Sequence, residues 1–69
     1  MPLTLANLGE ETVVRRVGGS PEVKKHLEDM GFAAGQSVTV VSAIAGDLIV
    51  RVKESRVAIS REMAGKIMV

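Results

Sequence analysis

The side chains that could take part in chemistry are few, and the single histidine has the most suggestive neighbours. His26 lies four residues after Glu22 and three residues before Asp29. Residues three and four apart share one face of a helix, and imidazole with carboxylates is a ligand set for transition metals. Exposed helices often carry such triples, so Glu22, His26 and Asp29 are weak candidates for a metal site.

No arrangement of residues indicates catalysis. The chain has no cysteine, which excludes disulfides, thiolate ligands and thiol nucleophiles. The acidic pairs Glu10–Glu11 and Glu28–Asp29 are adjacent in sequence and need not converge in space. A Gly-Gly pair at 18–19 precedes a predicted helix, but no phosphate-binding or dinucleotide fingerprint surrounds it. We therefore predict no enzyme and no bound cofactor.

The best helix signal positions these groups and covers residues 20–30. Ser20 is a good N-cap because its hydroxyl can accept a free backbone N–H. Pro21 suits the first helical position, where no N–H donor is needed. Val23, Leu27 and Met30 then form one apolar stripe, and His26 and the carboxylates lie on the opposite, polar face.

The end of this helix carries the only aromatic residue of the chain, Phe32. Gly31 can adopt the left-handed conformation that ends a helix. In that motif the residue after the glycine packs back on the last turn, which predicts a contact between Phe32 and Leu27. Met30 and Phe32 are large and lie beside a turn, so we also expect them to present some apolar surface.

The rest of the chain predicts short strands. Residues 11–17 read as one strand with Val13 and Val17 inward and Val14 outward. Residues 37–44 follow a period of two that places Val38, Val40 and Ile44 on one face. Further strands are predicted at 48–52, 56–59 and 66–69. Single helical turns, capped by Thr4 and Ser60, are expected near the two ends.

These elements predict a mostly β fold with one α-helix. Five short strands in a chain of 69 residues favour a small, bent five-stranded barrel, because closure removes exposed strand edges. The helix is expected between strands one and two, where it covers an open end. The length corresponds to a single domain, residues 1–69.

Composition bounds the partners and the location. The start of the chain does not resemble a signal peptide, and no apolar run reaches about 18 residues, so we expect a cytoplasmic protein without membrane insertion. Apolar residues make up 46% of the chain, which is more than a thin core can hide. We expect the surplus to form a patch for a partner or for self-association.

Nucleic acid is not an expected partner, although it stays an alternative. The formal net charge is only +1 and there is one aromatic residue, so neither a basic excess nor stacking platforms are present. Arg51, Lys53 and Arg56, around one predicted turn, are the only support for a nucleic-acid-binding barrel.

The order of these segments resembles the FeoA family of ferrous-iron transport accessory proteins. The similarity runs along essentially the whole chain: "LANLGEE", the Gly-Gly pair, "HLEDMGFAAGQSVTVV" and "SRVAISREMAGKIMV". "LEDMGFAAG" and the last of these segments are its most specific parts. The resemblance implies an SH3-like small barrel, a cytosolic location and no enzymatic activity.

The resemblance also implies a partner and a site. The partner is FeoB, the membrane protein that imports Fe²⁺ and carries a GTPase domain. By position, the contact surface involves Leu27, Met30, Gly31 and Phe32 at the helix end, with Arg56 on the strand opposite. The iron context leaves open a second reading, a small metal-binding or metal-sensing protein that uses His26 and its neighbouring carboxylates.

Overall fold

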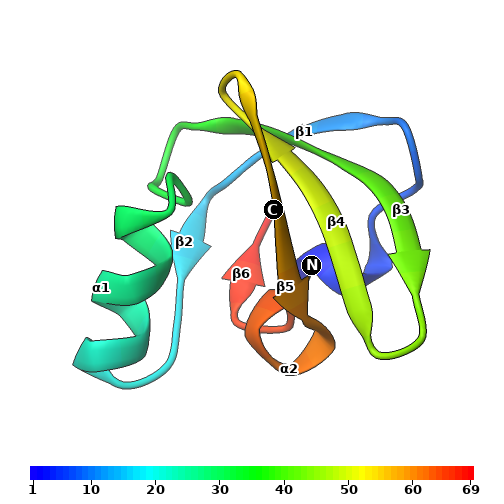
Figure 1. Ribbon diagram of the computed structural model, residues 1–69. Coiled ribbons are helices and arrows are strands. Elements are labelled where there is room, and N and C mark those ends of the chain that lie inside the picture. The colour runs from blue at the N-terminus through cyan, green and yellow to red at the C-terminus, as the bar shows by residue number, and fades with distance from the viewer.

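The computed structural model describes all 69 residues as a small, mostly β protein with one long helix. Its strands form two antiparallel sheets (Figure 1). The larger sheet has the order β1-β3-β4-β5, and the smaller one pairs β2 with β6. The bounds are β1 Glu11–Val13, β2 Arg16–Val17, β3 Ser37–Ile44, β4 Asp47–Val52, β5 Ser55–Ser60 and β6 Ile67–Met68.

This arrangement corrects the predicted closed five-stranded barrel. There are six strands in two separate sheets, because the predicted strand 11–17 divides. The backbone N–H of Val14 donates to the carbonyl of Gln36 at 2.9 Å, and the N–H of Arg15 donates to the carbonyl of Met68 at 2.7 Å. The chain therefore changes partner between two adjacent residues. As a result, helix α1 (Pro21–Asp29) follows the second strand instead of the first.

The division also reverses the predicted facing of two valines. Val14 is 1% exposed, whereas Val13 is 49% exposed. The prediction that Val13 points inward and Val14 outward was wrong, because strict alternation does not persist through the break. Val17 is buried as predicted.

A β-bulge has the same effect on β3. Val40 pairs with Val50, but the next pair is Ser42 with Ile49, so Val41 is an extra residue without a partner. One inserted residue moves every later side chain to the other face. Ile44 was predicted to lie with Val38 and Val40, and it is instead 59% exposed.

Local signals placed the helices correctly. The Ser20 hydroxyl accepts a hydrogen bond from the backbone N–H of Val23 at 3.3 Å, and Pro21 begins α1. Ser60 caps the short helix α2 (Arg61–Ala64) in the same way, accepting from Met63 N–H at 3.2 Å. The predicted cap at Thr4 was wrong, because the turn Leu3–Leu5 has no side-chain cap.

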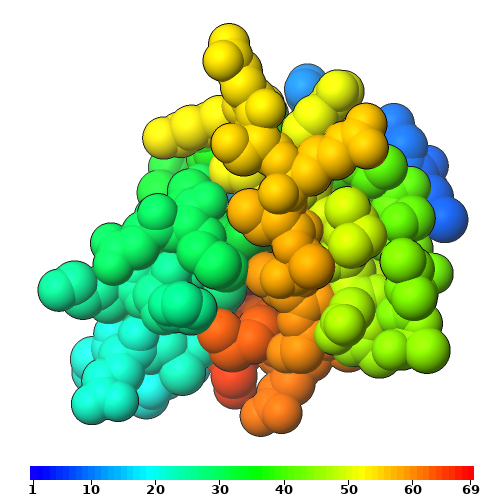
Figure 2. Space-filling view, viewed as in Figure 1, coloured from blue at the N-terminus to red at the C-terminus, as the bar shows by residue number.

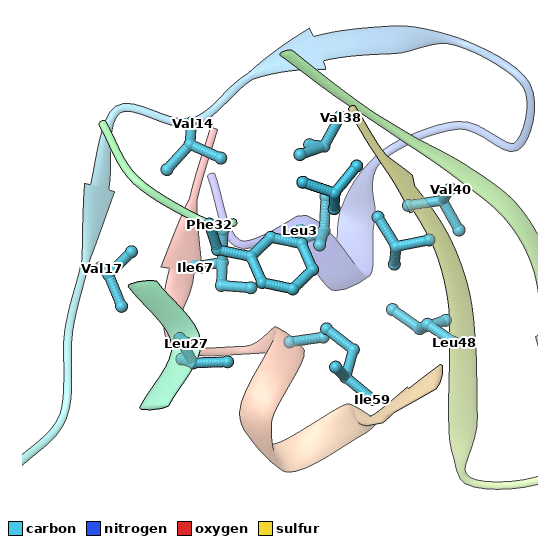
Figure 3. Packing of buried hydrophobic residues seen from close by; sticks show 13 residues of the cluster. Leu3, Val14, Val17, Leu27, Phe32, Val38, Val40, Leu48, Ile59 and Ile67 are labelled. Carbon is cyan, nitrogen blue, oxygen red and sulfur yellow. The ribbon is translucent and has the colours of Figure 1, made fainter. Parts of the chain in front are cut away.

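The core lies between the larger sheet, the two helices and the smaller sheet. It consists of 13 buried residues, and all of them are apolar. The ring of Phe32 lies among the labelled side chains at the centre, near Leu27, Leu3 and Ile67 (Figure 3). No helix in this structure has the length and apolar character needed to cross a membrane.

Candidate interaction surface

The end of α1 is held by the backbone pattern that the sequence predicts. Gly31 has φ +106° and donates its N–H to the carbonyl of Glu28 at 2.9 Å. The N–H of Phe32 donates to the carbonyl of Leu27 at 3.0 Å. These two bonds are those of a Schellman motif, which satisfies carbonyls that the helix end leaves free. Phe32 and Leu27 are both 0% exposed, as expected for the apolar contact of that motif.

The glycine is also required by packing. A Cβ atom at Gly31 would lie 2.7 Å from Cγ1 of Val52, which is closer than real carbon atoms approach. Val52 belongs to the inner face of the larger sheet and is 2% exposed. The end of α1 therefore packs closely against the last residue of β4. Both the backbone conformation of Gly31 and this close contact require a residue without a Cβ atom.

This packing divides the predicted contact residues into two groups. Leu27 and Phe32 are fully buried, so they support the surface from beneath and offer no area to a partner. Their predicted role as direct contacts does not fit this structure, because the helix-end motif draws both into the core. Met30 and Gly31 are half-buried, and Asp29 and Ala33 beside them are exposed. We call these four residues, Asp29, Met30, Gly31 and Ala33, the helix-end surface.

Arg56 faces the other side of the larger sheet from the helix end. It pairs directly with Arg51 across β4 and β5, and both side chains are exposed on the outer face of the sheet. The helix end contacts Val52, whose side chain points to the inner face. Arg56 and the helix end are therefore on opposite faces of the larger sheet, which the sequence could not reveal without the strand register.

The apolar surplus is exposed mostly at other places, which the sequence reasoning missed. The large apolar side chains that stand in solvent belong to the N-terminal segment and to β1 and β3: Met1, Leu5, Leu8, Val13, Val41 and Ile44. Leu8 and Val41 flank a backbone bond from Gly9 N–H to the carbonyl of Val40, 2.8 Å long. The adjacent residues Val13 and Val14 could have indicated that one large apolar side chain is exposed here. Neighbouring side chains in a strand point to opposite faces, so a strand with one buried face cannot bury both.

The candidate metal ligands do not form a ligand set. Glu22, His26 and Asp29 are all exposed on α1. Glu22 and Asp29 are separated by seven residues, about 10 Å along the helix axis. No group of three or more histidine, cysteine or acidic side chains is arranged to hold a metal ion. The surface also has no ligand-sized pocket.

Comparison with known proteins identifies the family. The family model described as "FeoA domain" matches residues 1–69. A protein of Methanocaldococcus jannaschii, named as a candidate Fe(2+) transport protein A, is 35% identical over 68 residues, covering 99% of this chain and 83% of its own.

Solved structures agree with this match. A crystal structure of an iron uptake regulatory protein (FeoA) has a TM-score of 0.89 at 26% identity, covering 97% of this chain and 91% of the other. The FeoA of Stenotrophomonas maltophilia, solved in complex with zinc and described as a prokaryotic SH3 domain protein, has a TM-score of 0.84 at 26% identity and covers 99% and 87% of the two chains. The chain therefore belongs to the FeoA family.

Proposed function

We propose that this protein is a non-enzymatic accessory protein of bacterial ferrous-iron uptake. It acts in the cytoplasm by docking on the cytosolic part of a FeoB-type membrane transporter. The observation that carries this proposal is the match of the FeoA family model over residues 1–69. The similar proteins named above are described in terms of iron transport or iron uptake, which supports the same role here.

The helix-end surface supplies the docking contact in this proposal. Met30 is half-buried and packs against the core with part of its side chain, which leaves the rest available to a partner. Methionine is flexible and polarisable, so it adapts to a partner surface. Gly31 beside it has no side chain, which allows a partner backbone to approach closely.

Co-purification tests the proposal. The chain carries an affinity tag and is incubated with detergent-solubilised membranes that contain a FeoB-type transporter. We expect the wild type to retain the transporter and Met30→Asp to lose at least about tenfold of the retained amount, because a buried charge at a contact is strongly unfavourable. Ala33→Asp, at an exposed position of the same surface, is expected to act in the same direction without touching the core.

Val13→Asp is the matched control, because Val13 is apolar and exposed on β1, away from α1. It is expected to retain the transporter as wild type does. Far-UV circular dichroism of each variant verifies that the fold is kept. Loss of binding with Val13→Asp but not with Met30→Asp would overturn the choice of surface. A wild-type chain that retains no transporter would overturn the function itself.

A further inference from the structure

The strand β5 forms the longer of the two edges of the larger sheet. The order β1-β3-β4-β5 gives the sheet two edges. The β1 edge is only three residues long, whereas β5 has six, Ser55–Ser60, paired with β4 at every position. It contains no proline and no bulge, which are devices that usually block an edge. Its close packing partners are β4 and α2, and Figure 2 shows the gold-to-orange β5 segment at the front surface, with β4 on one side and the green segment near the end of α1 on the other.

The hairpin turn determines which backbone groups are free. Two residues, Lys53 and Glu54, connect the paired residues Val52 and Ser55. A turn of this kind is closed by a backbone hydrogen bond between its flanking residues, and hydrogen-bonded pairs then alternate along an antiparallel ladder. The N–H and C=O groups of Arg56 and Ala58 therefore point away from β4. No backbone hydrogen bond outside the helices and strands involves either residue.

The same edge carries positive charge that the protein does not neutralise. Arg51 and Arg56 are directly opposite in a pair without mutual backbone bonds, where side chains are closest. Like charges in this position are destabilising. Neither guanidinium takes part in a side-chain hydrogen bond. Lys53 adds a third positive charge, and the acidic residues of the two strands and their turn are Glu54 in the turn and Asp47, which pairs with Ser60 at the far end.

We propose that β5 binds an extended, acidic segment of a partner protein as an additional strand. The free groups of Arg56 and Ala58 supply the backbone hydrogen bonds. A carboxylate of the segment lies beside Arg56 and Arg51 and neutralises them. An aliphatic side chain of the segment, two residues away and so on the same face, packs on Ala58 and on Ile49, its partner in β4. The inference deepens the proposed function, because it gives a chemistry and a binding mode to a docking protein.

Charge complementarity favours this occupant over a second copy of the chain. If two β5 strands paired around Ala58, Arg56 of each copy would lie opposite Ser60 of the other, and both arginine pairs would keep their repulsion. Nucleic acid is disfavoured because the outer face has no aromatic side chain on which a base could stack. The only aromatic residue, Phe32, is 0% exposed.

An NMR titration of the isolated protein tests the inference without any transporter. The probe is the acetylated and amidated peptide Thr-Glu-Thr-Val-Thr-Glu-Thr, which reads the same in both directions and places Glu, Val and Glu on one face. At about 5 mM peptide, where millimolar Kd values are detected, we expect amide shifts at Arg56, Ala58 and Ile49. The N–H of Ala58 should become protected from hydrogen exchange.

Two kinds of variant separate the backbone contribution from the charge. Arg56→Glu should weaken binding at least about tenfold, and Arg56→Lys should weaken it much less. Ala58→Pro removes a donor that faces away from β4 and should weaken binding about fivefold or more, whereas Ala58→Thr should not. If the proline variant does not fold, a peptide N-methylated at alternate residues tests the same point, because it keeps both carboxylates and lacks donors.

Several results would overturn the inference. These are the absence of shifts along β5, equal binding of a peptide with Lys in place of Glu, or equal binding of the N-methylated peptide. Shifts of β5 amides that depend on protein concentration alone would show a second copy on the edge instead. Preferential binding of an oligothymidine would show a nucleic-acid surface. Each result leaves the co-purification test unaffected, so failure of this binding mode is distinguishable from failure of the proposed function.

Discussion

Replacement of Gly31 by alanine tests the geometry on which the helix-end surface depends. The residue has φ +106°, a conformation that side chains with a Cβ rarely adopt. The new Cβ would also lie 2.7 Å from Cγ1 of Val52. Val52 is a β-branched residue with a stiff side chain, and at 2% exposure it cannot move out into solvent. Two separate penalties therefore act on the folded state.

Their magnitudes can be compared. A left-handed backbone costs an L-residue about 1–2 kcal/mol, and overpacking of a core costs about 1–3 kcal/mol. Alanine also lowers the conformational entropy of the unfolded chain, which stabilises the folded state by about 0.4–1 kcal/mol. The expected net loss in the free energy of unfolding is about 2–4 kcal/mol. A domain of 69 residues has a total stability of only about 3–10 kcal/mol, so the loss is easily measured.

Gly35→Ala is the matched control. Gly35 also has a positive φ, +91°, but nothing lies within 4 Å of the position of its Cβ. Its loss should therefore be the backbone term alone, about 1 kcal/mol. Val52→Ala removes the clashing methyl group, so Gly31→Ala in that background should cost no more than Gly35→Ala. The chain has no tryptophan or tyrosine, so urea unfolding is followed by far-UV circular dichroism.

The reasoning is refuted if Gly31→Ala and Gly35→Ala cost the same, since the contact with Val52 then has no consequence. It is also refuted if Gly31→Ala costs equally with and without the Val52 side chain. A double-mutant cycle is expected to give a coupling of about 1–3 kcal/mol between the two positions.

Three further changes follow from the structure. Phe32→Ala should cost about 3–5 kcal/mol in urea unfolding, because the ring is 0% exposed at the centre of the core; a cost near zero would contradict the packing. Val14→Asp should prevent folding, whereas Val13→Asp should change stability by less than about 0.5 kcal/mol. A larger loss of stability for Val13→Asp than for Val14→Asp would instead support the alternation predicted from the sequence. Ser20→Ala should cost about 1 kcal/mol by removing the cap on Val23 N–H, and Ser20→Asp should restore most of it.

Local chemistry determined the parts of this protein that could be predicted. The start of α1 depends on Ser20 and Pro21, and its end depends on Gly31 and Phe32. These signals act within a few residues, so the sequence contains all the information that they need. The strand predicted at 48–52 is likewise present as β4, with Leu48, Val50 and Val52 buried, because β4 runs unbroken between two paired strands.

The residues of the candidate site could be predicted only in part from the sequence. Phe32 was predicted both to close the helix and to present a contact, and the structure allows only the first, because the ring is fully buried. Whether a side chain beside a turn is covered depends on segments far away in the chain, here the end of β4. Arg56 could be recognised as a charged strand residue, but the face of the sheet on which it lies could be assigned only from the register between β4 and β5.

The sequence by itself determined the helix, its caps, the closing glycine and the absence of reactive groups such as thiols. Only the tertiary structure decided that residues 11–17 divide between two sheets, that β3 contains a bulge, and which valines and arginines face solvent. The physical reason is the period of two in a strand. A break in a strand, or one extra residue, moves every later side chain to the opposite face. The position of the break between Val14 and Arg15 depends on their hydrogen-bond partners, Gln36 and Met68, which lie more than 20 residues away in the chain.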